Sequence, residues 1–151
     1  MQITVPNEIL LAEAGELLAE GKDVELMPKG VSMLPFIVGD RDSVVLRKDD
    51  DLRPLVAGDI VLARMNGPVY VLHRIVRIGE GRIVLKGDGN LNATETVEPG
   101  DVLGRVISVV HPSGRSHKPG GAFVWRHSGT LLRRLVLGVY KRTVYKLLMN
   151  R

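Results

Sequence analysis

The chain has 151 residues, of which 44% are hydrophobic, so it can form one domain with a buried core. It contains no cysteine, which excludes disulfides, thiolate metal sites and a cysteine nucleophile. The first 25 residues carry six acidic side chains against one lysine, unlike a secretory signal. The longest uncharged stretch has ten residues, whereas a membrane-spanning helix needs about 20. We therefore expect a protein without a signal peptide or transmembrane helix.

Charge is distributed unevenly along the chain. The net charge is +4, but all 17 acidic residues lie within the first 101 residues, together with 11 of the 21 basic ones. The last 50 residues carry ten basic residues and no acidic one. A basic tail on an acidic body indicates either an anionic partner or a charged face exposed to solvent.

The first element expected is a helix over residues 7–20, because Pro6 and Asn7 are helix-start signals and the apolar residues fall on one side. Gly21 can end this helix. The pattern then changes to short runs typical of β-strands, over 24–27, 43–47, 60–64, 69–78, 82–85 and 102–110. Four Gly-Asp pairs separate these runs as turns. The sequence predicts a mainly β fold, a coiled antiparallel β-sheet or small barrel.

Residues 111–121 have the composition of a linker, with two prolines, three glycines and two serines. Residues 122–151 then predict a basic helix whose apolar side chains lie roughly on one side. The expected organisation is a β domain with its N-terminal helix over 1–110, the linker, and a basic C-terminal helix.

The segment most suggestive of chemistry is Lys29-Gly-Val-Ser-Met-Leu-Pro35, which follows a predicted strand and contains Ser32. A serine hydroxyl is a nucleophile only when a neighbouring base takes its proton, and histidine is the usual base. Of the four histidines, only His73 lies in a strand-like run, where apolar neighbours disfavour the charged ring. A third group must orient the ring, and Asp88, in a turn after the next strand, is a candidate. The residues alone leave open that all three have only structural roles.

Five short motifs occur in the order and spacing of a known superfamily. They are Gly30-x-Ser-Met-x-Pro35, Gly58-Asp-Ile-Val61, His73-Arg-Ile-Val76, Lys86-Gly-Asp-Gly-Asn90 and Gly104-Arg-Val106. Over residues 24–110 the chain therefore resembles the type I signal peptidase and SOS-repressor peptidase superfamily, and it is most similar to the Ser-His branch. The resemblance implies a largely β catalytic domain of the signal-peptidase type. It also implies Ser32 as nucleophile, His73 as general base and Asp88, from the Gly-Asp motif, as the acidic partner.

Two departures from the superfamily pattern bear on the site. The Ser-His branch usually has a second aspartate soon after the Gly-Asp motif, but residues 91–96 contain only Glu95 as an acidic group. Either Asp88 or Glu95 is therefore expected to be the orienting acid. Many signal peptidases have a serine where this chain has Gly30, so backbone N–H groups near Ser32 would have to bind the oxyanion.

Other chemistry is weakly supported. Lys86 could replace His73 as the base, by analogy with the Ser-Lys branch, although a lysine beside a turn is usually solvated. No metal or other cofactor is expected, because the remaining histidines lack metal-ligand spacing.

Together these features predict a serine endopeptidase that makes limited cuts in an extended segment of another polypeptide. The alternative is a regulatory or binding module that retains the peptidase fold without catalysis. The basic residues 122–151 have three interpretations: packing on the β domain, lying on an anionic membrane surface, or binding nucleic acid. Nucleic acid is not expected, because no recognition motif accompanies the charge. We expect a cytoplasmic protein, either free or peripheral on a membrane.

Overall fold

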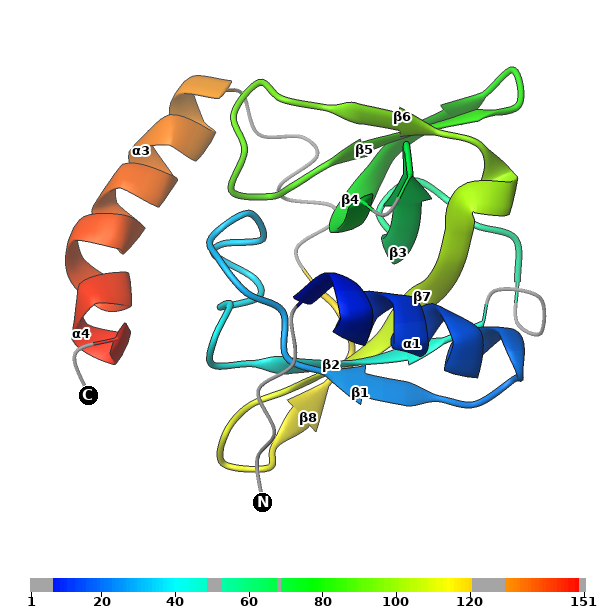
Figure 1. Cartoon of the computed structure of the whole chain (residues 1–151). Coiled ribbons are helices and arrows are strands. Elements are labelled where there is room, and N and C mark those ends of the chain that lie inside the picture. The colour runs from blue at the N-terminus through cyan, green and yellow to red at the C-terminus, as the bar shows by residue number, and fades with distance from the viewer. Residues whose placement is uncertain (1–6, 49–52, 68, 121–129, 150–151) are drawn as a thin grey trace.

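The structure, a computed structural model, describes residues 7–48, 53–67, 69–120 and 130–149. Within these residues, eight strands form one curled antiparallel sheet in the order β1-β2-β7-β3-β4-β5-β6, and β8 pairs with β7 (Figure 1). The strands are β1 (Val24–Leu26), β2 (Ser43–Arg47), β3 (Ile60–Met65), β4 (Val69–Gly79), β5 (Arg82–Lys86), β6 (Glu95–Val97), β7 (Val102–Val110) and β8 (Ser116–His117). The helical elements are α1 (Asn7–Ala19), the 3₁₀ turn η2 (Pro99–Asp101), α3 (Thr130–Tyr140), the π-helical turn η3 (Lys141–Tyr145) and α4 (Lys146–Met149). The predicted mainly β fold, with a helix near each end, is confirmed.

Burial along the strands follows from their place in the curled sheet. In β2, Val44 and Leu46 are fully buried between half-buried neighbours, as expected for a strand with one face on the core. In β3, the four residues from Ile60 to Ala63 are all buried. This strand is covered on both faces, because its alternate residues belong to two different hydrophobic clusters.

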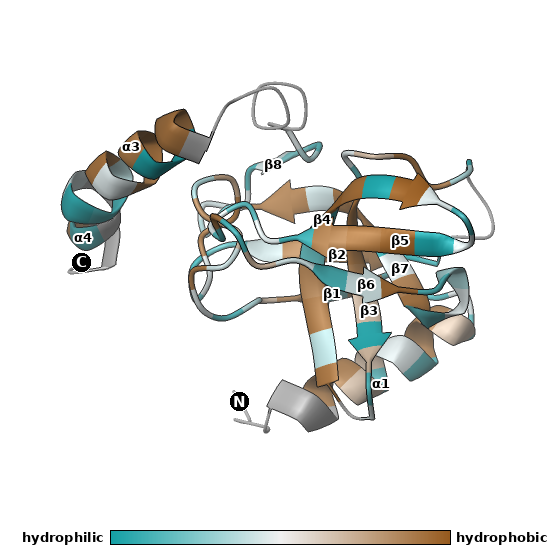
Figure 2. Ribbon diagram, turned by 90° about the horizontal axis from the view of Figure 1, so that it is seen from above, coloured by the Kyte–Doolittle hydropathy of each residue, from teal (hydrophilic) through white to brown (hydrophobic). Residues whose placement is uncertain are grey.

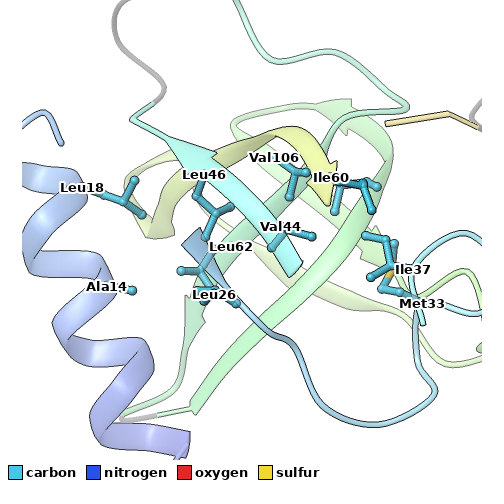
Figure 3. Packing of buried hydrophobic residues seen from close by; sticks show 11 residues of the cluster. Ala14, Leu18, Leu26, Met33, Ile37, Val44, Leu46, Ile60, Leu62 and Val106 are labelled. Atoms are coloured by element: carbon cyan, nitrogen blue, oxygen red, sulfur yellow. The ribbon is translucent and has the colours of Figure 1, made fainter. Parts of the chain in front are cut away.

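Helix α1 closes one side of the sheet by packing against β1, β4 and β7. Ala14 and Leu18 are buried in the larger hydrophobic cluster, where they face strand residues (Figure 3). The helix ends at Gly21, which has φ +84°. The N–H groups of Gly21 and Lys22 donate to the carbonyls of Leu18 and Leu17, which is the Schellman arrangement.

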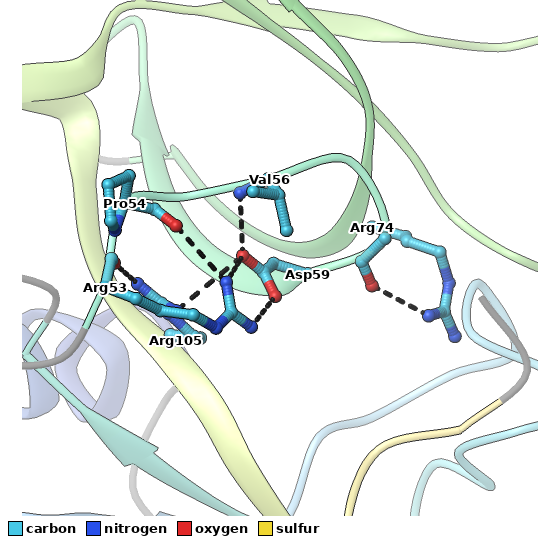
Figure 4. Close-up of polar contacts among 7 residues, drawn as sticks. Arg53, Pro54, Val56, Asp59, Arg74 and Arg105 are labelled. Carbon is cyan, nitrogen blue, oxygen red and sulfur yellow. Dashed lines mark hydrogen bonds and ion pairs between the residues drawn. The ribbon is translucent and has the colours of Figure 1, made fainter. Parts of the chain in front are cut away.

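The Gly58-Asp59 motif has a structural role (Figure 4). Asp59 accepts hydrogen bonds from the Arg53 guanidinium at 2.6 and 2.9 Å and from the Val56 N–H at 2.9 Å. Arg105 Nη1 lies 3.8 Å from the same carboxylate. Burial raises the pKa of the Asp59 carboxyl, but these hydrogen bonds and the positive charges lower it more, so the pKa lies below its usual value. The motif therefore ties the turn before β3 to β7.

The region after β7 differs in part from the prediction. Residues 111–121, predicted as a linker, include β8, which pairs with the end of β7. The helix predicted over 122–151 begins at Thr130 within the described residues, and 122–129 lie outside them. None of the described helices is long and apolar enough to cross a membrane.

Helix α3 stands beside the sheet rather than against one of its faces (Figures 1 and 2). It contacts the domain through Leu137, which is 4% exposed and packs with Leu34 and Val38. Half-buried Phe36, Leu91 and Tyr140, the last on α3 itself, complete this small cluster. The helix thus contacts the loop between β1 and β2 and the loop after β5.

Candidate active site

Ser32 lies in the loop between β1 and β2, which folds into successive tight turns. Gly30 has φ +84°, a conformation that residues with a side chain rarely adopt. Gly39 packs on Gly30 so closely that a Cβ at residue 39 would overlap the Gly30 carbonyl oxygen. The two glycines therefore let the two arms of the loop approach each other closely on either side of Ser32 in the sequence.

Apolar side chains next to Ser32 hold this loop in place. Met33 and Ile37 are buried in the larger hydrophobic cluster (Figure 3), and Leu34 and Val38 are buried in the cluster with α3. Ser32 itself is half-buried, and its hydroxyl makes no hydrogen bond with any described residue. The loop is thus anchored on both sides, and the hydroxyl remains available for chemistry.

His73 is held by a carboxylate on a neighbouring strand. It lies on β4 opposite Val61, and it is 7% exposed. Its Nδ1 lies 2.9 Å from Oε2 of Glu95, on the edge strand β6. An ionised carboxylate only accepts hydrogen bonds, so in a neutral ring this contact favours the tautomer with its hydrogen on Nδ1. Nε2 is then unprotonated, as a general base must be.

Asp88 does not take the position predicted for it. Its two carboxylate oxygens accept hydrogen bonds from Arg74 Nε and Nη2, at 2.8 and 2.7 Å. Arg74 follows His73 on β4, so the two side chains point to opposite faces of the strand, and Asp88 is on the Arg74 face. Burial raises the pKa of the Asp88 carboxyl, and the hydrogen bonds from Arg74 oppose this. The carboxylate that contacts His73 is that of Glu95, the other candidate.

The Arg74–Asp88 pair instead joins separate segments of the chain. Arg74 also donates to the carbonyl oxygens of Gly58 and Gly120, at 2.9 and 3.0 Å. Its guanidinium lies 5.5 Å from the centre of the Phe36 ring. Figure 4 shows the bond from Arg74 back to the turn before β3. Both partners are almost fully buried, so removal of either would leave an uncompensated charge in the interior.

The turn from Gly87 to Asn90 brings the Ser32 loop against His73. The Gly89 N–H donates to the Ser32 carbonyl oxygen at 2.8 Å, and the Asn90 N–H donates to the Gly87 oxygen at 2.9 Å. A Cβ on Gly87 would overlap the Ser32 carbonyl oxygen and would lie 3.1 Å from His73 Nε2. The carbonyl group of Ser32 and the free ring nitrogen of His73 therefore both lie against Gly87.

Ser32 and His73 line the same pocket, which has a volume of about 260 Å³. Most of its other walls are apolar and come from α1, β1, β3, β4 and the Ser32 loop. They include Leu11, Leu26, Met33, Ile37, Leu62, Tyr70 and Leu72. Strand β1, which contributes Leu26, lies at an edge of the sheet. An extended peptide could thus pair with β1 and place an apolar side chain in the pocket.

Backbone N–H groups beside the serine can bind an anion. Within the described residues, the N–H groups of Ser32 and Met33 donate to no acceptor. The next N–H, that of Leu34, is bonded to the Val31 carbonyl at 3.2 Å. Backbone N–H groups without an acceptor are the kind of donor that can stabilise a tetrahedral oxyanion.

Lys86 is engaged away from the serine. Its Nζ donates to the Leu91 carbonyl oxygen at 2.6 Å, and it lines a different pocket together with Arg133. Burial and the Arg133 charge lower the pKa of Lys86. Among the described residues, no group of three or more His, Cys, Asp or Glu side chains could hold a metal ion.

No protein-family model matches the chain, and no match was found among curated proteins. The resemblance to the signal peptidase superfamily therefore rests on the five motifs. The structure places Ser32 and His73 at one pocket and Glu95 on His73, and it pairs Asp88 with Arg74.

Two features of the site were not predicted from the sequence: the pocket wall from α1, and the contact between the Gly87–Asn90 turn and the Ser32 loop. The glycines at 87 and 89 were the available signal for that contact, because paired glycines often mark close backbone approach.

Proposed function

We propose that this chain is a serine endopeptidase that makes limited cuts in extended segments of other polypeptides. One observation carries the proposal most directly. The Nδ1 of His73 is engaged by Glu95, and its Nε2 lies beside Gly87, against which the Ser32 loop packs. This placement supports the proposal, because a serine is activated by a base whose other ring nitrogen is engaged by an acid.

In the proposed reaction, Ser32 Oγ attacks the carbonyl carbon of the scissile peptide bond while His73 Nε2 takes its proton. The N–H groups of Ser32 and Met33 bind the oxyanion of the tetrahedral intermediate. Protonated His73 then donates the proton to the leaving amine, and the C–N bond breaks. Water hydrolyses the acyl-enzyme by the same steps.

Ser32 Oγ and His73 Nε2 are not hydrogen-bonded to each other. Such bonds are often long in free enzymes and tighten when substrate binds. The Glu95 carboxylate keeps Nε2 of the neutral ring in the accepting form before attack, and it stabilises the charged ring that forms after proton transfer.

Cleavage specificity can be tested with a peptide library derived from a whole proteome, with products identified by mass spectrometry. We expect the wild-type protein to cut a restricted set of sites that share an aliphatic side chain close to the scissile bond, because the pocket walls are apolar. The same library treated with Ser32→Ala should remain uncut. If wild-type protein binds peptides from the library but cuts none, the non-catalytic alternative becomes the better account.

Gly87→Ala should lower the cleavage rate by about 10- to 100-fold, because displacing a reacting group by about 1 Å can cost that much. The new methyl group would overlap the Ser32 carbonyl oxygen, so the Ser32 loop and the His73 ring must move apart. Gly79→Ala is the matched control, since a Cβ at Gly79 meets no atom within 4 Å. Equal rates for the two variants would contradict this role of Gly87.

A further inference from the structure

The outer side of the C-terminal helix carries a row of exposed apolar side chains. Leu131, Leu135 and Val139 are 73%, 59% and 63% exposed, and their spacing of four residues places them in one line along α3. Leu132 and Val136 form a second exposed row beside the first. We call these five residues the outer apolar face.

This face points away from the domain. Leu137 is the residue of α3 that is buried against the Ser32 loop, and it lies two positions from both Leu135 and Val139. Residues two apart on a helix point to different sides, so the outer apolar face cannot be covered by the sheet. Figure 2 shows several hydrophobic residues along α3, at the side of the domain.

Cations accompany the outer apolar face. Arg134, Lys141, Arg142 and Lys146 are all exposed, and the chain contains no acidic residue after Asp101. Arg133 is different, because it is half-buried and its charge acts on Lys86 and Asp88 in the domain. The exposed side of the helix therefore combines apolar surface with positive charge only.

The positive charge of the helix distinguishes among three surfaces that could cover the outer apolar face. A second copy of the chain would bring two wholly positive helices together, which costs electrostatic energy. A nucleic acid would neutralise the cations but would leave the leucines in water. An anionic lipid surface accommodates both the apolar side chains and the cations. The apolar side chains enter the boundary between headgroups and acyl chains, and the cations remain among the headgroups.

We infer that α3 to α4 form an interfacial helix that binds the chain to an anionic membrane surface. The helix would lie in the plane of the bilayer with the outer apolar face buried. Because Leu137 joins α3 to Leu34 and Val38, the Ser32 loop would be held close to the bilayer. Binding itself does not depend on the proposed peptidase activity.

The test is co-sedimentation of the whole chain with vesicles of phosphatidylglycerol and phosphatidylcholine in equal parts, and with vesicles of phosphatidylcholine alone. We expect binding to the anionic vesicles only, weakened as salt rises from about 0.1 M to about 1 M and the screening length falls from about 10 to about 3 Å. Arg134→Glu, Lys141→Glu and Arg142→Glu together should lower partitioning by about a hundredfold or more, since each cation contributes about fivefold. Leu135→Glu with Val139→Glu should lower it by at least about tenfold.

Matched controls lie on the β4–β5 hairpin and the β7–β8 turn. One control variant replaces the exposed Arg77, Arg82 and Arg115 by Glu, and a second carries Ile78→Glu. Both should bind the anionic vesicles within a few-fold of the wild-type protein. Absence of binding to anionic vesicles at low salt would overturn the inference. A second result would also overturn it: a wild-type dimer in light scattering that becomes a monomer in the double variant Leu135→Glu, Val139→Glu. A second copy of the chain would then cover the outer apolar face. Cleavage of a soluble peptide should be unchanged in all these variants, so failure here is distinct from failure of the peptidase proposal.

Discussion

Ser32→Ala should abolish peptide cleavage, with a loss in kcat of about 10⁴-fold or more. The substitution removes the atom that attacks the scissile carbonyl, and neither His73 nor the free N–H groups can replace it. The fold should be unaffected, because the Ser32 hydroxyl bonds to no described residue and the loop is held by its apolar neighbours. The measurements are the cleavage rate of a peptide from the library and the thermal unfolding temperature.

Ser108→Ala is the matched control for this loss. Ser108 is a half-buried serine on β7, and its hydroxyl makes only one long hydrogen bond, of 3.5 Å, to His117. The control variant should cleave at the wild-type rate. If Ser32→Ala retained more than about a hundredth of that rate, the nucleophile would have been misassigned.

Glu95→Gln should lower kcat by up to about 10⁴-fold, as loss of the ionised orienting carboxylate does in serine peptidases. A neutral amide can no longer stabilise the positive charge that His73 acquires, and its NH₂ group can force the ring into the wrong tautomer. Because Glu95 acts through His73, the test includes a spectroscopic readout. The proton on His73 Nδ1 should give a far-downfield NMR signal in the wild-type protein, and Glu95→Gln should shift or remove it.

Asp88→Asn should behave differently from Glu95→Gln. It leaves the buried Arg74 charge without its partner, so the free energy of unfolding should fall by about 3 to 5 kcal/mol. The downfield His73 signal should persist in the folded fraction. Glu25→Gln, an exposed residue on β1, controls for the loss of a negative charge and should change neither quantity. If Glu95→Gln kept activity within a few-fold of wild type while Asp88→Asn removed the signal, the acid would have been misassigned.

Most strands could be predicted because each has enough residues to show a pattern. The run over 43–47 alternates in burial and β7 is nine residues long, and both were predicted with their observed bounds. Strands β6 and β8 have three and two residues, and both were missed, whereas β1, also of three residues, was predicted as part of the longer run over 24–27. The existence of β6 and β8 depends on partners that are distant in the sequence.

The choice between Asp88 and Glu95 stayed open for the same reason. Asp88 follows β5 within a recognisable motif, whereas Glu95 lies on the unpredicted strand β6. Which of two carboxylates meets His73 depends on the face of β4 that each approaches, and the sequence alone does not show how β5 and β6 pair. The sequence could predict that Ser32 and His73 lie at one site, because the motifs that contain them are distinctive. The pocket that they share depends on how α1 and β1 pack, which only the structure shows.

Covalent labelling tests the central claim most directly, because it needs no knowledge of the natural substrate. A fluorophosphonate reacts with an activated serine hydroxyl, which displaces fluoride and forms a stable bond to phosphorus. We predict one label per chain, located on Ser32 by mass spectrometry of digested protein, and loss of labelling in both Ser32→Ala and His73→Gln. Labelling of another serine, or labelling of His73→Gln as fast as wild type, would contradict a nucleophile at Ser32 that is activated by His73.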